Sequence, residues 1–205
     1  MTTKREKTMK TVGEVIAQSR EPMMRQVSSR DSSQKTKLLV SRYRTVESFL
    51  QNFNPDYQKA ICSSSDECFF GDYPTLIDVR IAYGENVPIA WLVPQLYNLS
   101  EYCGCRDKLE GKPLEECAHV IASEYSYLKV SELMLFFVRF KSGRYGKFYG
   151  SVDPLVITTS VRDFINERTF AYEQHDREVR SRREKEERKK AITYEEYLRR
   201  KESGL

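Results

Sequence analysis

Apolar side chains return at helical spacing in several separate stretches of the chain. The first run lies between residues 38 and 53, where every third or fourth position is apolar: Leu39, Tyr43, Val46, Phe49, Leu50 and Phe53. This period predicts one helix over 38–53, which the Asn-Pro pair at residues 54 and 55 should end. The next stretch, 56–74, lacks such a period and contains glycine and proline, so we interpret it as a connector.

The clearest apolar patterns begin at residue 74. They predict helices over 74–84, 86–104, 113–128 and 131–140, the last with Leu133, Phe136, Phe137 and Phe140 on one face. Gly84 is expected to end the first of these helices, Pro94 to kink or split the second, and Ser131 to cap the fourth. A further helix should start with Asp153 as its N-cap and Pro154 at its first position. The predicted fold class is therefore all-α, a small multi-helix domain.

Both ends of the chain are more polar than its middle. Residues 1–37 are basic and rich in serine, with only a short apolar stretch, and we expect them to form a disordered arm. After Phe170 the apolar period fades. Eight basic and five acidic side chains then alternate between residues 176 and 190, which favours a long charged helix with ion pairs at i and i+4. The capping box "TYEE" at residues 193 to 196 predicts a short terminal helix.

These patterns divide the chain into four parts. The predicted parts are a disordered basic arm (1–37), a helix plus connector (38–73), a helical domain (74–172) and a charged helical extension (173–205). A length of 205 residues agrees with this division, because it accommodates one domain with a real core plus arms.

The composition indicates that much of the chain lies in solvent. Charged residues make up 31% of the sequence, and the mean hydropathy is −0.62. The sequence contains no run of about 18 apolar residues and no signal peptide, so we expect a cytoplasmic protein without membrane contact. Its five cysteines are an odd number in a chain of this size, which indicates reduced thiols rather than disulfides.

The net charge of +4 conceals an uneven distribution. Residues 1–45 carry eleven Lys/Arg against four Asp/Glu, residues 46–132 six against fourteen, and residues 133–205 seventeen against twelve. This basic, acidic, basic order predicts ends that meet a polyanion, or that contact the acidic middle of another copy.

The stretch "FFVRFKSGRYGKFYG", residues 136–150, combines aromatic rings, cations and glycines, and no acidic residue occurs between residues 133 and 152. Glycines let a backbone approach phosphate closely, while tyrosines stack on unpaired bases. The candidate nucleic-acid-binding residues are Arg139, Lys141, Arg144, Tyr145, Lys147 and Tyr149. The alternative interpretation is that the rings pack inward as a corner between two helices and the cations only solvate it. The pattern leaves both interpretations open.

Motifs for metal binding or catalysis are weak. The soft ligands Cys103, Cys105, Cys117 and His119 lie close in sequence, but C-x-C is not the usual zinc spacing and Cys117 fits an apolar helix stripe. We therefore expect no metal and no cofactor. The sequence has no Walker lysine loop, no G-x-S-x-G and no H-E-x-x-H, so we expect a protein that is not an enzyme.

The run from residue 74 to 200 resembles a known family. Its core, "LMLFF-RFK-GRYG-FYG--DP", together with the later "TYEEY", resembles an uncharacterised family of small bacterial proteins of phage and mobile-element type. That family carries a domain-of-unknown-function label, so the resemblance implies no catalytic residue. The layout of a helical domain, an aromatic-basic corner and a long charged helix also looks like that of phage replication accessory proteins.

Two functions are consistent with the sequence. The first is a non-enzymatic accessory protein that binds nucleic acid, with single-stranded DNA as the candidate ligand and a replication protein as the candidate partner, in replication or helicase loading. The second is a protein-interaction adaptor that docks a partner or another copy through its charged helix and acidic middle. The two differ in a testable way, because only the first requires salt-sensitive binding through the basic corner.

Overall fold

The computed structural model describes residues 29–190 and residue 199. The all-α fold class is confirmed, because the described residues form helices and, apart from isolated bridges, no strands. The predictions for residues 1–28 and for the terminal helix after residue 193 lie outside the described residues.

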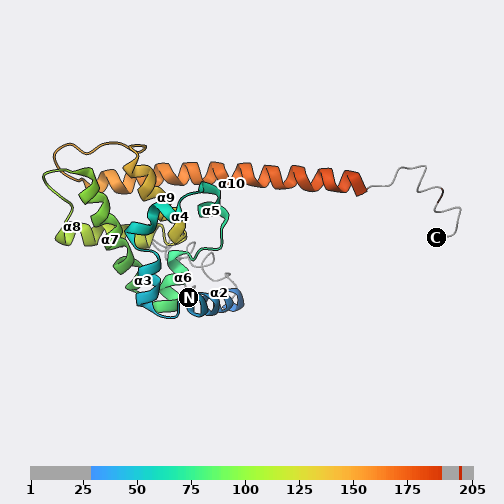
Figure 1. Ribbon diagram of the computed structural model, residues 1–205, viewed down its shortest axis with the longest axis horizontal. Coiled ribbons are helices and arrows are strands. Elements are labelled where there is room, and N and C mark those ends of the chain that lie inside the picture. Colours follow the sequence, from blue (N-terminus) through green and yellow to red (C-terminus); the bar gives the residue numbers. More distant parts are fainter. Residues whose placement is uncertain (1–28, 191–198, 200–205) are drawn as a thin grey trace, which may run out of the picture.

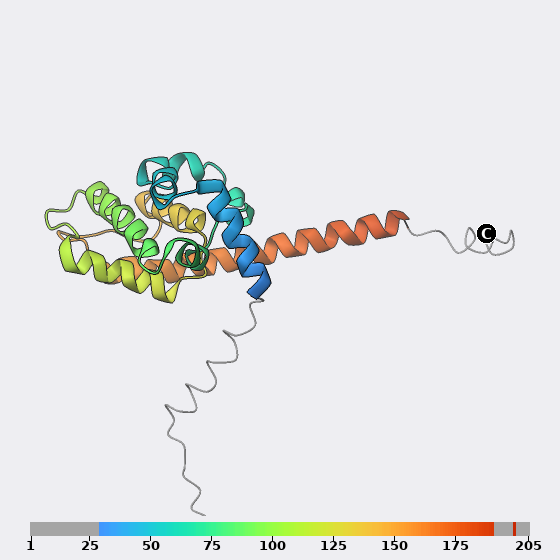
Figure 2. The same cartoon turned by 90° about the horizontal axis from the view of Figure 1, so that it is seen from below.

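The body consists of short helices, and one long helix crosses it and continues beyond it (Figure 1). In chain order the body contains α2 (Ser29–Tyr43), α3 (Val46–Asn52), the 3-10 turn η1 (Pro55–Tyr57), α4 (Gln58–Ile61), α5 (Ser65–Phe70), α6 (Leu76–Tyr83), α7 (Val87–Cys103), α8 (Gly111–Glu124) and α9 (Val130–Lys141). The long helix is α10 (Pro154–Lys190), whose 37 residues give it a length of about 55 Å. Figure 2 shows from a second direction that α10 extends beyond the body.

The helix predicted over 38–53 is in fact two helices. Arg44 takes a left-handed conformation with φ of 57°, and the Thr45 side chain then caps α3 by accepting a hydrogen bond from the backbone N–H of Ser48 (3.2 Å). The apolar period continues across this break because both helices face the same cluster of aromatic rings. α2 begins at Ser29, so residues 29–37 of the predicted arm are helical in the structure.

The stretch predicted as a connector, 56–74, also forms helices. It contains most of η1, all of α4 and α5, and two residues of the core, Cys68 and Phe69. Ser64 caps α5 by accepting a hydrogen bond from the N–H of Glu67 (3.4 Å). These helices are too short to show an apolar period, which explains why the sequence pattern missed them.

The helices after residue 74 follow the predictions with local differences. Gly84 ends α6 as expected. Pro94, predicted to kink or split its helix, does not split it, because α7 continues through Pro94. Ser131 is not a cap, because α9 begins at Val130 with Lys129 at the N-cap position. Instead, the buried Ser131 hydroxyl donates a hydrogen bond to the carbonyl of Cys68 (2.8 Å).

One apolar core joins residues from α2 to α10. Its largest fully buried side chains are Trp91, Phe49, Phe136, Phe137 and Phe164. The core includes residues on both sides of the predicted boundary at residue 74, and the four-part division of the chain stays a prediction. No helix in the described part of the chain is long and apolar enough to cross a membrane.

α10 belongs to the body only in its first half. Asp153 starts it as predicted, since its side chain accepts a hydrogen bond from the N–H of Leu155 (2.8 Å). Ile157, Val161 and Phe164 are fully buried, but no residue of α10 beyond this point is. The predicted charged extension is therefore present as an exposed helix through the described residues up to 190.

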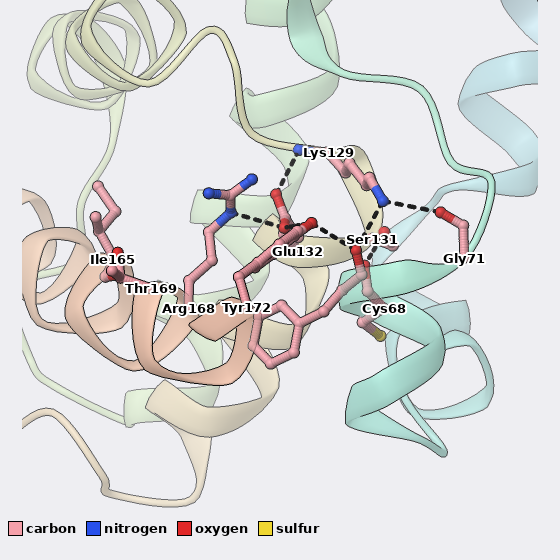
Figure 3. A network of polar contacts seen from close by, with 10 residues as sticks. Cys68, Gly71, Lys129, Ser131, Glu132, Ile165, Arg168, Thr169 and Tyr172 are labelled. Carbon is pink, nitrogen blue, oxygen red and sulfur yellow. Dashed lines mark hydrogen bonds and ion pairs between the residues drawn. The ribbon is translucent and has the colours of Figure 1, made fainter. Parts of the chain in front are cut away.

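A buried polar network holds α10 on α9 (Figure 3). The carboxylate of Glu132, which has no exposed surface, accepts hydrogen bonds from Arg168 Nε (2.7 Å), the Tyr172 hydroxyl (3.1 Å) and the Lys129 backbone N–H (2.9 Å). The Lys129 ammonium in turn donates to the carbonyls of Phe69 and Gly71 (2.7 and 2.9 Å). The network thus connects the start of α9, the middle of α10 and the end of α5, which are distant in sequence.

Candidate nucleic-acid interface

The basic and aromatic stretch forms the corner between α9 and α10, residues 142–153. The chain reverses here through positive φ angles, 81° at Gly143 and 127° at Gly146, a region that favours glycine. Backbone hydrogen bonds from Asp107 N to Gly150 O (3.2 Å) and from Val152 N to Asp107 O (3.0 Å) fasten the corner to the loop that precedes α8.

Arg139, the first candidate residue, is held inside the molecule. Its side chain is 16% exposed, pairs with Glu167 (Nη1 to Oε2, 2.8 Å) and donates to the Ser65 hydroxyl (3.1 Å). Its guanidinium also lies 5.5 Å from the centre of the Phe69 ring. These contacts make Arg139 a link between α9, α5 and α10.

Lys141 is similarly engaged. Its ammonium donates hydrogen bonds to the amide oxygens of Gln58 (2.7 Å) and Asn98. Burial lowers the pKa of Lys141, since the charged form is poorly solvated there. The half-buried ammonium therefore bonds to the buried amide of Gln58 and the half-buried amide of Asn98.

The ring of Tyr145 packs inward. It stacks on Phe136 with ring centres 5.5 Å apart, and its hydroxyl donates to Glu167 Oε2 (3.2 Å). Burial raises the pKa of this phenol. Phe148 also packs inward, stacked on Phe140 at 5.3 Å. For these two rings the structure agrees with the alternative interpretation, an aromatic corner that closes the end of the core.

Glu167 is the residue that the sequence pattern missed. It accepts from Arg139 and also pairs with the half-exposed Arg144 (Nε to Oε1, 2.9 Å). The absence of acidic residues between 133 and 152 therefore does not leave these two charges uncompensated. The compensating carboxylate comes from α10, outside that stretch of the sequence.

Lys147 and Tyr149 are the two candidates that point outward. Tyr149 is 87% exposed, and Lys147 is exposed and makes no ion pair with any residue that the structure describes. They flank Phe148 in the sequence, and Phe148 and Tyr145 are both packed against the core.

The fastening to the preceding loop brings two further groups to the corner. Arg106, with a side chain that is 92% exposed, forms a long ion pair with Asp107 (Nε to Oδ1, 3.7 Å), and the backbone of Asp107 forms a bridge with that of Ser151. Tyr102, at the end of α7, is 64% exposed, and its ring lies 5.8 Å from the Lys141 ammonium. No local pattern marked either residue, because both reach the corner through contacts that are distant in sequence.

The four weak metal candidates do not form a site. Within the described residues, no three His, Cys, Asp or Glu side chains lie close enough together to hold a metal ion. Cys117 is buried in α8, where burial raises the pKa of its thiol to about 12, whereas His119 lies two positions later and is exposed. Cys103 and Cys105 are partly buried against the core.

Comparisons with known proteins give one match. Neither the curated proteins nor the solved structures matched the chain. Residues 111–204, which contain α8, α9, the corner and α10, are similar to a family of unknown function (DUF6633).

Proposed function

We propose that this protein is a non-enzymatic accessory factor that binds single-stranded nucleic acid at the corner between α9 and α10. The observation that carries the proposal is the exposure of Tyr149, which is 87% exposed next to Lys147, a cation without an ion pair among the described residues. A ring exposed to this degree gains little from the protein itself, but it can stack on an unpaired base for about 1–3 kcal/mol.

The corner has the stiffness that such binding needs. Tyr145 and Phe148 are packed against the rings of α9, so the backbone that carries Lys147 and Tyr149 is fixed from behind. Ordering a loop on binding costs free energy, and a corner that is already ordered avoids most of that cost. Tyr102 adds a second exposed ring near the same end of the body.

The cations that support phosphate contact are fewer than the sequence indicated. Arg139 and Lys141 are engaged internally, which leaves Arg106, Arg144 and Lys147. Arg144 can turn to a phosphate without leaving Glu167 unpaired, because Glu167 keeps its contact with Arg139. The site is therefore small, and it fits a short segment of single strand better than a duplex surface.

The proposal is tested by fluorescence anisotropy of the full chain with labelled single-stranded DNA, single-stranded RNA and duplex DNA. Three phosphate contacts predict that the logarithm of the binding constant falls with the logarithm of salt concentration with a slope of about −2. We expect single strands to bind more tightly than duplex. Absence of salt-sensitive binding to every probe would contradict the proposal.

A setting in phage or mobile-element replication, including helicase loading, rests on the sequence resemblance and on the layout of the chain. We propose phage or mobile-element replication as the biological process in which the protein acts, and the cytoplasm as its location. Co-purification of the tagged chain with a replicative helicase or primase from its host tests the proposal. Enrichment of neither protein would contradict it.

The projecting half of α10 favours a second candidate function, an adaptor for another protein. Between residues 176 and 189 every described side chain except Val179 is exposed, and the helix extends away from the body (Figure 1). An adaptor predicts a complex or oligomer that persists when Lys147 and Tyr149 are changed. Size-exclusion chromatography with light scattering on that variant distinguishes the two candidates.

A further inference from the structure

A groove lies between α5 and α10, where α10 leaves the body. It has a volume of about 620 Å³ and is lined by Ser64, Asp66, Glu67, Phe70, Gly71, Phe170, Ala171, Gln174, His175 and Glu178. Two phenylalanines form the apolar part of its floor: Phe70, on which the His175 ring stacks at 4.1 Å, and Phe170, which is 60% exposed. Large rings on an open floor are typical of surfaces that receive another segment.

The rim of this groove is acidic. Asp66, Glu67 and Glu178 line it, and no lysine or arginine does. Among the described residues none of the three carboxylates forms an ion pair, although α10 is rich in arginine. An apolar floor with an unpaired acidic rim selects a segment that is both apolar and basic.

A second cavity adjoins the groove on the side of α2. It has a volume of about 560 Å³, and it shares Phe70 and Gly71 with the groove. Lys35 and Leu38 of α2 line its other side. The two cavities are therefore neighbours at Phe70 and Gly71.

The chain itself supplies a segment of matching chemistry. Residues 1–28 carry six Lys/Arg against three Asp/Glu, and Met23, Met24 and Val27 stand shortly before the start of α2 at Ser29. Methionine packs well on aromatic rings. A stretch of 28 residues can extend to about 90 Å, which is ample to reach the groove from α2.

We propose that residues 1–28 dock in the groove between α5 and α10 of the same chain. The methionines pack on Phe70 and Phe170, and the basic side chains face the carboxylates of Asp66, Glu67 and Glu178. This site is separate from the corner that we propose for nucleic acid, so either proposal can fail alone.

The direct test places a photo-reactive probe in the groove of the full chain. Phe170 is replaced by p-benzoylphenylalanine, the purified protein is irradiated, and the cross-linked peptides are identified by mass spectrometry. The matched control carries the same probe at Leu155, which is 71% exposed on the same helix. We expect cross-links from position 170 to residues 1–28 at several times the yield found from position 155.

Two further measurements keep the result interpretable. Mixing light and isotopically heavy protein separates contacts within one chain from contacts between copies, and cross-links that join light to heavy chains would overturn docking within the chain. The double change Asp66→Lys, Glu178→Lys should reduce the yield several-fold, whereas Glu115→Lys, Glu116→Lys on α8 should not. Equal yields from positions 170 and 155 would also overturn the proposal.

Discussion

Arg168 of α10 places its Nε 2.7 Å from Oε1 of Glu132 on α9, a carboxylate that has no exposed surface. The guanidinium also lies 4.4 Å from the centre of the Tyr172 ring, and the Tyr172 hydroxyl donates to the same Glu132 oxygen. Because Glu132 has no contact with solvent, its carboxylate bonds to these partners instead of to water. The ion pair between Arg168 and Glu132 therefore stabilises the packing of the first half of α10 against α9.

Removing the arginine of this pair is expected to destabilise the fold strongly. Arg168→Met leaves a buried carboxylate without its counter-charge, which typically costs about 3–5 kcal/mol of unfolding free energy. Arg177→Met on the same helix is the matched control, because its pair with Glu173 is exposed and is worth at most about 1 kcal/mol. Urea unfolding of both variants checks this. Equal losses in the two would contradict the role assigned to Glu132.

The inward cations should affect stability without affecting affinity. Arg139→Gln removes a charge-assisted pair with Glu167 and a hydrogen bond to Ser65, at a cost of about 2 kcal/mol. We expect its dissociation constant for single-stranded DNA to change less than twofold while the protein stays folded. A folded Arg139→Gln variant that loses binding would place Arg139 in the interface instead.

Gly71 is expected to tolerate no side chain. A Cβ at this position would lie 2.4 Å from the Glu67 carbonyl oxygen and 2.5 Å from its Oε1, closer than atoms can pack. Gly71→Ala therefore forces the end of α5 to move and should cost about 1–3 kcal/mol of unfolding free energy. Urea unfolding measures the loss, and a change below about 0.5 kcal/mol would show that the end of α5 yields freely.

The buried thiol of Cys117 predicts a loss of stability in alkali. Its pKa in the folded chain is about 12, above the ordinary value of 9.0, because burial disfavours the thiolate. The unfolded chain therefore releases this proton first, so the contribution is complete below pH 9 and is lost as the pH rises towards 12. The unfolding free energy of Cys117→Ala should fall less between pH 8 and 10.5 than that of the wild type. Parallel pH profiles would contradict this.

The projecting half of α10 should be separable from the stability of the body. Arg182→Pro interrupts the helix in its exposed part, where a proline costs about 3 kcal/mol of local helix free energy. We expect lower ellipticity at 222 nm with an unchanged urea midpoint. A clear shift of the midpoint would show that the exposed half supports the body after all.

Most of the fold could be predicted because its longer helices bury regular apolar stripes. In α9 the predicted face of Leu133, Phe136, Phe137 and Phe140 is buried, and so is every other side chain from Val130 to Phe137, because this helix runs through the core. The short helices α4 and α5 could not be found in this way, since four to six residues carry too little of a period. The break at Arg44 was missed because the pattern continues across it.

The candidate site was only partly accessible to sequence reasoning. The pattern located the corner and its open residues, Lys147 and Tyr149, but could not separate them from Arg139 and Lys141, which look alike in sequence. What separates them is the position of Glu167, Gln58 and Asn98, and these contacts form only in the folded chain. Charge in a sequence stretch is therefore a poor measure of charge at a surface.

The central claim is tested most directly by the dissociation constant of labelled single-stranded DNA for Lys147→Glu, Tyr149→Ala. The matched control is Lys59→Glu, Tyr57→Ala, which changes the same residue types at the same spacing on another exposed part of the body. We predict that the corner variant binds at least tenfold more weakly than the wild type, with an unchanged urea midpoint, and that the control binds normally. Equal affinities of the two variants would contradict nucleic-acid binding at the corner.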